Sequence, residues 1–244
     1  MSVGKLHPIT IATRDIAEVF ERIGFTVASG PELEDEWHNF DALNIPATHS
    51  SRDMQDTFWT KESPPRVLRT QTSSVQIRYM EERIKNNILP PYRIIAPGKV
   101  FRNEATDATH EAQFYQNEGL VVGEDITMAH LKGTLNMFFR EYLGPDARVR
   151  FRPSYFPFTE PSVEVDVWFS GATGGKGKWL EVVGAGMVHP NVLKNVGIDQ
   201  KRYRGFAFGG GIERLIMVKY NIPDIRLFHA GDVRFVHGFE QKII

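Results

Sequence analysis

The sequence KVFRNEATDATHEAQFYQNEGL, residues 99–120, carries the apolar–polar alternation that decides the fold. The alternation begins in residues 100–104, stops in the small and polar residues 105–109, and resumes at Gln113. Because a period of two places successive side chains on opposite faces of a strand, this pattern predicts two strands joined by a long hairpin. One face would be buried, and the other would carry Arg102, Glu104, His110, Phe114, Gln116 and Glu118. That set is more polar chemistry than folding requires, so this face is the candidate functional surface.

The rest of the chain shows helical and strand periodicities that indicate the fold class. Apolar residues at helical spacing predict helices over residues 6–23, 32–40, 73–88, 127–143 and 212–220, and a helical turn over 192–196. Alternating segments predict strands over residues 25–29, 67–70, 149–152, 163–169, 179–183 and 206–208. Thr13 or Asp15 is expected near the first N-cap, and Gly24 suits the position after that helix. Because most strands follow one another through hairpins, we expect an α+β fold in which helices flank an antiparallel sheet, as a single domain over residues 1–244.

The composition of the chain excludes several classes of protein. It has no cysteine, which excludes disulfides, thiolate catalysis and thiolate metal sites. No stretch approaches the roughly 18 consecutive apolar residues of a membrane span, and no secretory signal is visible, so a cytoplasmic location is expected. The net charge is only −1. A protein that gripped nucleic acid by phosphate neutralisation alone would be clearly basic, so any nucleic-acid substrate must be held by a local patch or a partner.

Three consecutive glycines, residues 209–211, precede the helix predicted at 212–220 and allow two interpretations. In the first, they let the backbone approach a ligand closely while Arg214, in the first helical turn, contacts an anion. In the second, they form only a tight turn between a strand and a helix, with Arg214 on the surface. The run lacks the Gly-Lys-Ser/Thr of a Walker A loop and the parallel βαβ setting of a dinucleotide fingerprint. Taken alone, the glycines leave both interpretations open.

Several motifs taken together resemble those of a known enzyme family. Arg-Asn-Glu at 102–104, the pair His110 and Phe114, and Gly-x-Gly-x-Glu-Arg at 209–214 are similar to motifs 2 and 3 of the class II aminoacyl-tRNA synthetases. On this resemblance motif 1 covers about residues 24–31, motif 2 about 100–119 and motif 3 about 205–217. The sequences at 39–46, 52–58, 69–73, 156–162, 186–191 and 205–209 resemble the α subunit of bacterial phenylalanyl-tRNA synthetase. The likeness runs from about residue 7 to residue 244 with few evident gaps, so it implies nearly the whole class II catalytic domain of that family.

This resemblance implies a ligase that activates L-phenylalanine with ATP and transfers it to tRNA(Phe). The first step gives phenylalanyl-adenylate and pyrophosphate, and the second passes the acyl group to the 2′-hydroxyl of the terminal adenosine. Arg102 would hold the α-phosphate and Arg214 the γ-phosphate, which makes these two the implied catalytic residues. A guanidinium suits both positions because its planar fork matches phosphate oxygens and keeps its proton. The implied ATP-binding set also contains Glu104 and Phe114 at the adenine, His110 at the triphosphate, and Glu181 and Gly211.

The resemblance also implies a set of residues for the amino acid. This set comprises Gln116 and Glu118 for the ammonium group, Ser73, Gln71 and Gln55 for the carboxylate, and Phe156, Phe158 and Ala207 for the ring. The two phenylalanines would pack edge-to-face against the substrate ring. A methyl group at Ala207 leaves room for phenyl, while an apolar floor offers no partner to the hydroxyl of tyrosine.

Two carboxylates are implied metal ligands. Glu160 resembles a Mg²⁺ ligand shared with the β subunit, and Glu181 lies where class II enzymes place a carboxylate for the metal bound to ATP. Carboxylate and phosphate oxygens suit Mg²⁺, a hard cation that keeps several waters. A solvent-side strand carboxylate remains the alternative for Glu181. His189 is expected to be structural rather than catalytic.

The resemblance has consequences for partners. The α chain of this family meets a β subunit, so that subunit and tRNA(Phe) are the implied macromolecular partners, with a homodimer through motif 1 for the isolated chain and no membrane. On this resemblance we expect the N-terminal coiled-coil arm of bacterial α subunits to be absent, and we therefore expect amino-acid activation to survive better than tRNA charging. The glycine-rich tip at 170–178 receives no role. The alternative function is a non-catalytic synthetase paralogue that binds or regulates, although both arginines and Glu118 are present and favour an enzyme.

Overall fold

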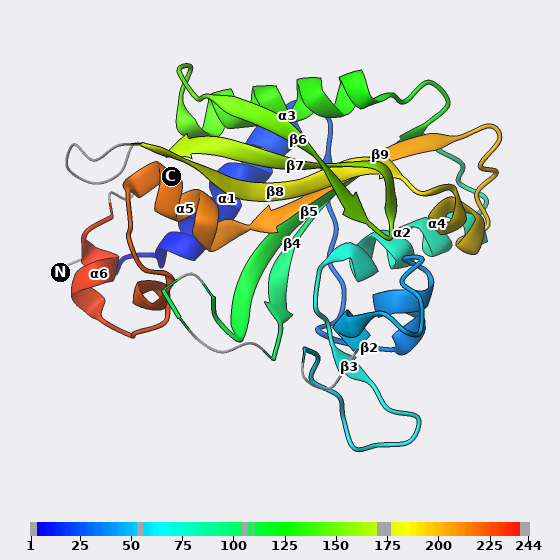
Figure 1. The fold of residues 1–244 in the computed structure, drawn as a ribbon, viewed down its shortest axis with the longest axis horizontal. Helices are drawn as coiled ribbons and strands as arrows, with labels where there is room; N and C mark the ends of the chain where they lie inside the picture. The colour runs from blue at the N-terminus through cyan, green and yellow to red at the C-terminus, as the bar shows by residue number, and fades with distance from the viewer. Residues whose placement is uncertain (1–3, 53–55, 104–106, 109, 170–176, 240–244) are drawn as a thin grey trace.

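The fold is built on a seven-stranded sheet with the strand order β1-β4-β5-β9-β8-β7-β6 (Figure 1). The computed structural model describes residues 4–52, 56–103, 107–108, 110–169 and 177–239. The strands of this sheet are β1 (Thr26–Val27), β4 (Tyr92–Phe101), β5 (Gln113–Gly123), β6 (Val149–Phe156), β7 (Thr159–Phe169), β8 (Lys178–Val188) and β9 (Arg204–Gly211). A separate two-stranded sheet pairs β2 (Leu33–Glu34) with β3 (Val67–Leu68). The helices are α1 (Pro8–Arg22), α2 (Ser73–Lys85), α3 (Met128–Leu143), α4 (Pro190–Asn195), α5 (Ile212–Tyr220) and α6 (Val233–His237).

The predicted hairpin forms the middle of the large sheet. β4 and β5 pair in antiparallel register from Tyr92↔Val122 to Phe101↔Gln113. β5 pairs on its other side with β9, and the order continues antiparallel through β8, β7 and β6. β1 differs because it runs parallel to β4. The α+β fold class is therefore confirmed, with a mixed sheet rather than a wholly antiparallel one.

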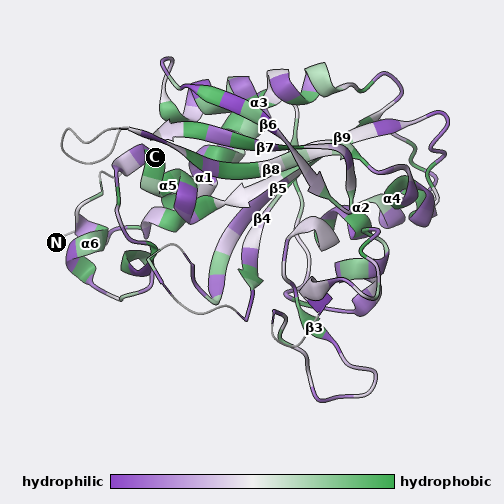
Figure 2. Ribbon diagram, in the orientation of Figure 1, coloured by the Kyte–Doolittle hydropathy of each residue, from purple (hydrophilic) through white to green (hydrophobic). Residues whose placement is uncertain are grey.

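Helices cover the two faces of the sheet unequally. On one face α1, α3 and α5 enclose a core in which the ring of Phe20 stacks on Phe138 at 4.8 Å and on Phe208 at 5.2 Å between centroids. On the other face, α2 and α4 contribute to a second, smaller core. Because neighbouring residues of a strand point to opposite faces, Val121 joins the first core and Leu120 the second. Figure 2 shows hydrophobic stretches along β7 and β8 between these layers. The part of the second face that α2 and α4 leave uncovered is available for a site.

Most helices follow the sequence pattern. α5 has the predicted bounds, and α3 begins after Thr127, which forms a capping box with His130. The N-cap of α1 is His7, whose Nδ1 accepts the N–H of Ile9, so the prediction of Thr13 or Asp15 was wrong. The helix begins earlier because Pro8 suits its first position. Gly24 follows it at φ +84°, as expected. None of the described helices is long and apolar enough to cross a membrane.

The helix predicted over residues 32–40 is wrong for its first half. Leu33–Glu34 pairs with β3 instead, and a five-residue π-helix follows at Trp37–Asp41. Glu34 is fully buried and accepts hydrogen bonds from Arg78 of α2 at 2.9 and 3.0 Å. These tertiary contacts hold the segment extended and override its helical spacing.

The glycine run 209–211 belongs to β9, so of the two interpretations left open by the sequence the tight turn is wrong. A Cβ on Gly209 would lie 2.6 Å from Cγ of Glu118, and one on Gly210 would lie 2.1 Å from the carbonyl oxygen of Val182. Side chains are therefore excluded because neighbouring strands approach too closely. Gly211 differs, since its nearest neighbours would lie 4.0 Å away.

We expect Gly210→Ala to destabilise the protein by about 3 kcal/mol, because the clash is with backbone that cannot rotate away. Gly211→Ala is the matched control and is expected to change stability by less than about 0.5 kcal/mol. Urea unfolding of both variants measures the difference. Equal stabilities would contradict the close strand packing.

Candidate active site

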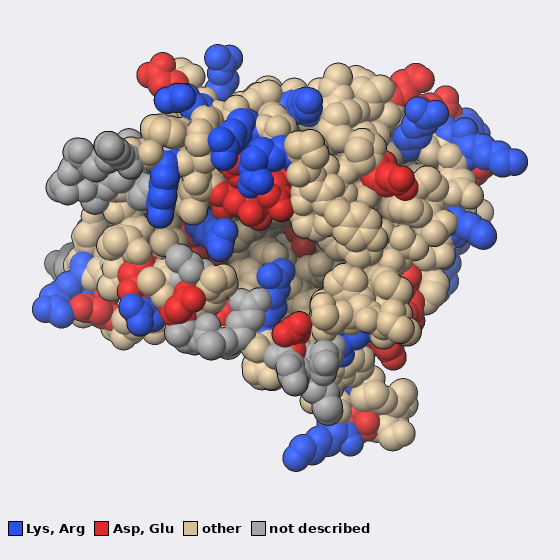
Figure 3. Space-filling view, in the orientation of Figure 1, with Lys and Arg blue, Asp and Glu red and all other residues tan. Residues whose placement is uncertain are grey.

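A pocket of about 350 Å³ opens on the uncovered face of the sheet, between β5, β8, β9 and the first turns of α2 and α5. Figure 3 shows the hollow near the centre of the molecule, with basic and acidic side chains around it. The structure brings together at this pocket thirteen of the residues that the resemblance implied: Gln71, Ser73, Arg102, His110, Phe114, Gln116, Glu118, Phe156, Phe158, Glu181, Ala207, Gly211 and Arg214. Gln55 and Glu104 lie outside the described residues.

Two arginines line the polar part of the pocket. Arg102 follows the end of β4, donates from Nε to the carbonyl oxygen of Thr70 at 3.2 Å, and lies 5.1 Å from the ring centroid of Phe114. Arg214 lies in the first turn of α5 and donates from Nη1 to the carbonyl oxygen of Glu181 at 3.1 Å. A helix N-terminus and two guanidinium groups create positive potential in this region, which suits a polyanionic ligand.

His110 is held by a local turn beside the pocket. Its backbone N–H donates to Oδ1 of Asp107 at 2.8 Å, and its Nδ1 lies 3.0 Å from both carboxylate oxygens of the same residue. The side chain is about half exposed. The expected position beside a bound polyphosphate remains a prediction.

A buried carboxylate lies at the centre of the pocket. Glu118 of β5 accepts from the backbone N–H of Thr72 at 3.1 Å, from Nε2 of Gln76 at 3.0 Å, and from the hydroxyl of Ser73. Burial raises the pKa of Glu118 to about 7, although the bonds from Ser73 and Thr72 and the charge of Arg102 act to lower it. A carboxylate that burial destabilises, and that lines an open pocket, is suited to bind a cation.

Ser73 is hydrogen-bonded within the protein, and its contact with a substrate carboxylate remains a prediction. Its hydroxyl donates to Glu118, so the donor predicted for a substrate carboxylate is used within the protein. Gln116 lines the same pocket, and its Oε1 is buried without a hydrogen-bond partner among the described residues. An unsatisfied buried acceptor in a pocket indicates a ligand that donates, such as an ammonium group.

The other part of the pocket is apolar. Phe156 and Phe158 stack on one another, with centroids 5.8 Å apart and ring planes 9° apart. Gly184 permits the close approach of Phe156, since a Cβ there would lie 2.8 Å from Cζ of that ring. Ala207 lines the pocket from β9, where it pairs with Leu120. A ligand would therefore meet two aromatic rings and a methyl group at this end.

The two expected metal ligands are far from equivalent. Glu181 lines the pocket, and burial, followed by the charge of Glu164, raises its pKa. A carboxylate with that unfavourable environment beside Arg214 fits a site for a hard divalent cation bound to phosphates. Glu160 does not line the pocket; its side chain is 75% exposed and lies 3.4 Å from Nε2 of His189. His189 is the N-cap of α4 and accepts the N–H of Asn191, as expected of a structural residue.

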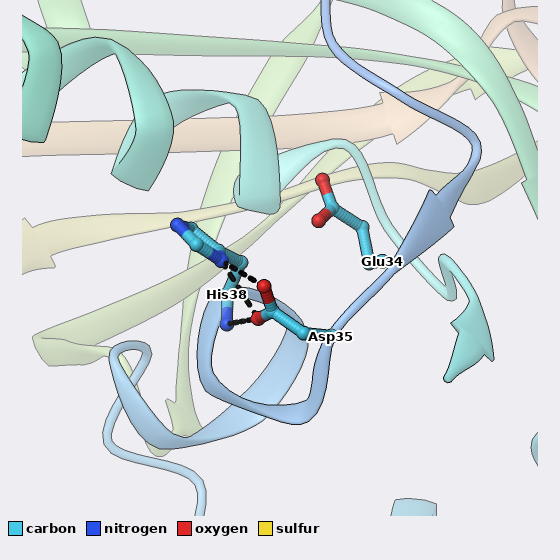
Figure 4. Close-up of side chains that lie close together, drawn as sticks. All are labelled: Glu34, Asp35 and His38. Atoms are coloured by element: carbon cyan, nitrogen blue, oxygen red, sulfur yellow. Dashed lines mark hydrogen bonds and ion pairs between the residues drawn. The ribbon is translucent and has the colours of Figure 1, made fainter. Parts of the chain in front are cut away.

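One group of three potential metal ligands, Glu34, Asp35 and His38, occurs elsewhere in the described part of the chain (Figure 4). The carboxylate of Glu34 is bound by Arg78, and the ring of His38 lies between Asp35 at 2.7 Å and Glu81 at 2.9 Å. Because these groups satisfy one another and lie outside the pocket, we assign them a structural role.

Sequence reasoning missed several pocket residues. Gln76 and the N–H of Thr72 hold Glu118, yet they lie 42 and 46 residues away in the chain and carry no local signal. Glu213 lines the pocket and belongs to the Gly-x-Gly-x-Glu-Arg sequence, which was the available signal. Its carboxylate oxygens accept the backbone N–H of Tyr115 at 2.9 and 3.1 Å.

Comparisons with known proteins agree with this geometry. Residues 1–239 match the family model for the tRNA synthetases class II core domain (F). The phenylalanine–tRNA ligase alpha subunits of Edwardsiella ictaluri and Yersinia pestis are each 55% identical to this chain over 240 residues, which is 98% of this chain and 69% of each relative. The chain therefore belongs to the class II tRNA synthetase core family, within the group of the phenylalanine–tRNA ligase alpha subunits.

Proposed function

We propose that this chain is the catalytic module of a phenylalanine–tRNA ligase. It activates L-phenylalanine with ATP and transfers the product to the 2′-hydroxyl of the terminal adenosine of tRNA(Phe). One observation carries the proposal: a single pocket joins two arginines, a buried carboxylate with an unsatisfied amide oxygen beside it, and an aromatic end of suitable polarity for phenyl. In the proposed arrangement the arginines bind the phosphates, the carboxylate and the amide oxygen bind the head group of the amino acid, and the aromatic end binds its ring.

In the first step, a carboxylate oxygen of phenylalanine attacks the α-phosphorus of ATP, and the bond to the bridging oxygen of the β-phosphate breaks. Arg102 contacts the α-phosphate and stabilises the charge that grows there, while Arg214 holds the γ-phosphate. Phe114 stacks on adenine, Gly211 leaves space for the nucleotide, and His110 contacts the triphosphate. Mg²⁺, when bound near Glu181, supplies further neutralisation of phosphate charge. No covalent enzyme intermediate is needed, so positioning supplies much of the rate.

Polar side chains hold the charged end of the amino acid, and apolar side chains hold its ring. Glu118 and Gln116 accept hydrogen bonds from the ammonium group, and the ring lies against Phe156, Phe158 and Ala207. Entry of the ammonium supplies the cation that buried Glu118 lacks, and it frees Ser73, with Gln71, to donate to the substrate carboxylate. Gln55 is proposed for the same carboxylate. Binding of the amino acid therefore exchanges hydrogen-bond partners at the N-terminus of α2.

In the second step, the 2′-hydroxyl oxygen of the tRNA attacks the carbonyl carbon of the adenylate, and AMP leaves. We propose a β subunit as the protein partner, with Glu160 as a Mg²⁺ ligand at that contact and a homodimer through residues 24–31 as the state of the isolated chain. The single-domain organisation, the cytoplasmic location and the weak charging of tRNA by the chain alone remain predictions.

Phenylalanine-dependent ATP–pyrophosphate exchange tests the proposal, with a β subunit supplied. Exchange that requires phenylalanine is expected. A folded sample without exchange that still binds a non-hydrolysable phenylalanyl-adenylate analogue in calorimetry would indicate a non-catalytic paralogue instead.

We expect Ala207→Gly to admit para-chloro-phenylalanine, because loss of the methyl group lengthens the apolar end. Exchange with this substrate should rise at least about tenfold relative to phenylalanine, a difference typical of one methyl-sized contact. Ala207→Val provides the opposite change and should reduce exchange with phenylalanine itself. If Ala207→Gly activates the chlorinated substrate no better than the wild type, Ala207 does not line the ring site.

A further inference from the structure

Glu213, the second residue of α5, is a buried carboxylate to which the reaction described above gives no role. Its side chain is 1% exposed and lines the pocket. Both carboxylate oxygens accept the backbone N–H of Tyr115, at 2.9 and 3.1 Å. The bond joins α5 to β5 through two residues that are 98 positions apart in the chain.

This contact replaces a strand pair that the fold cannot make. The ladder between β5 and β9 ends at Gln116↔Gly211, because the chain then turns into α5. Tyr115 lies one residue beyond that last pair, so its N–H has no strand partner on this side. The carboxylate of Glu213 accepts it instead, which satisfies a partly buried N–H.

The residues on either side of this bond are those proposed to hold ATP. Phe114 precedes Tyr115 and lines the pocket, whereas Tyr115 itself packs against the core on the other face. Arg214 directly follows Glu213 and donates to the carbonyl oxygen of Glu181. The Glu213–Tyr115 bond therefore ties the strand that carries the adenine platform to the helix that carries the γ-phosphate arginine.

Glu213 lies beside a histidine and at a helix end. Nε2 of His229 lies 3.7 Å from Oε1 of Glu213, and the interaction with this carboxylate raises the pKa of His229. The position in the first turn of α5 is also favourable for an anion. The carboxylate is thus held from three directions, by a strand, a histidine and a helix end.

We propose that Glu213 is a positioning residue that sets the distance between Phe114 and Arg214 and so determines the affinity for ATP. The proposal rests on the proposed function, since it takes ATP as the nucleotide. Gln116 stays paired with Gly211 in the ladder when the bond is lost, so the amino-acid site should move less than the nucleotide site.

The test compares Glu213→Ala, Glu213→Gln and Glu34→Ala in pyrophosphate exchange with the β subunit supplied, and in calorimetric titration with ATP. Glu213→Ala should raise KM and Kd for ATP at least about tenfold and change KM for phenylalanine less than twofold, as loss of a bond to a charged group predicts. Glu213→Gln keeps a carbonyl oxygen that can accept from Tyr115, so it should restore both ATP constants to within about threefold of the wild type.

Glu34→Ala controls for the general loss of a buried carboxylate, because Glu34 is 0% exposed, is bonded to Arg78 and lies outside the pocket. It should leave the ATP constants unchanged. The proposal is overturned if Glu213→Ala behaves like Glu34→Ala, or if Glu213→Gln is as impaired as Glu213→Ala. A wild type that binds ATP but shows no exchange contradicts the catalytic function, while the ATP titrations still decide the role of Glu213.

Discussion

Replacing Arg102 with alanine is expected to lower kcat/KM for phenylalanine-dependent pyrophosphate exchange by about 10³-fold, the upper range for a lost transition-state donor. The reason is that, in the proposed reaction, the α-phosphate gains charge as the carboxylate oxygen attacks, and Arg102 lies 5.1 Å from the ring centroid of Phe114, the proposed adenine platform. Arg102→Lys keeps the charge but loses the planar fork, so an intermediate loss is expected.

Arg202→Ala is the control for this measurement. Arg202 is more than half exposed, pairs with Glu124 at 2.8 Å and does not line the pocket. Its removal should change kcat/KM less than twofold. If Arg102→Ala loses no more activity than Arg202→Ala, the assignment of Arg102 to the α-phosphate is wrong. A selective rise in KM for ATP with unchanged kcat would place Arg102 at a ground-state contact instead.

The parts of this fold that follow from sequence are those in which local pattern and tertiary contact agree. The alternation around Arg102 predicted the β4–β5 hairpin, although it did not predict that both faces of β5 are buried from Gln116 to Gly123. The helical spacing of residues 212–220 predicted α5 with its observed bounds. The segment 32–40 failed because a strand partner and a buried ion pair, both distant in the chain, outweigh its weak helical preference.

The site was predicted by residue type more completely than by contact. Glycines at 209–211 read alike whether they form a turn or a strand, and only the approach of Glu118 and Val182 decides between the two. Likewise the resemblance implied Glu118 for the ammonium group of the substrate, but it did not predict the bonds of Glu118 to Ser73 and Gln76. Those bonds depend on where α2 begins relative to β5, which no local pattern encodes.

Glu118→Gln is expected to lower kcat/KM for phenylalanine by about 150-fold, which corresponds to about 3 kcal/mol for one missing partner of a buried charge pair. The same substitution should make the protein more stable near neutral pH. Burial raises the folded pKa of Glu118 to about 7 from an ordinary value of 4.5. Between those two values the unfolded carboxyl is ionised while the folded one keeps its proton, so stability falls as the pH rises from 4.5 to 7 and is constant above.

The difference amounts to about 3 kcal/mol, and glutamine removes it because an amide does not titrate. Urea unfolding at pH 5 and pH 8 should therefore show that the free energy of unfolding of Glu118→Gln increases relative to that of the wild type as the pH increases. In the wild type, kcat/KM for phenylalanine should fall as the pH drops below 7, because the ammonium group needs the ionised carboxylate.

Asp166→Asn provides a control of opposite sign. Asp166 is also buried, but its hydrogen bonds from Arg152 and Arg150 hold its pKa below the ordinary range. Its ionised form therefore stabilises the fold above the unfolded pKa, and that contribution is lost as the pH falls through the folded pKa. Asp166→Asn should destabilise at neutral pH, where Glu118→Gln stabilises. If both substitutions destabilise equally at pH 8, burial of Glu118 carries no cost. Ionised Glu118 would then be stable in the empty pocket, and the substrate ammonium group would not be needed to stabilise it.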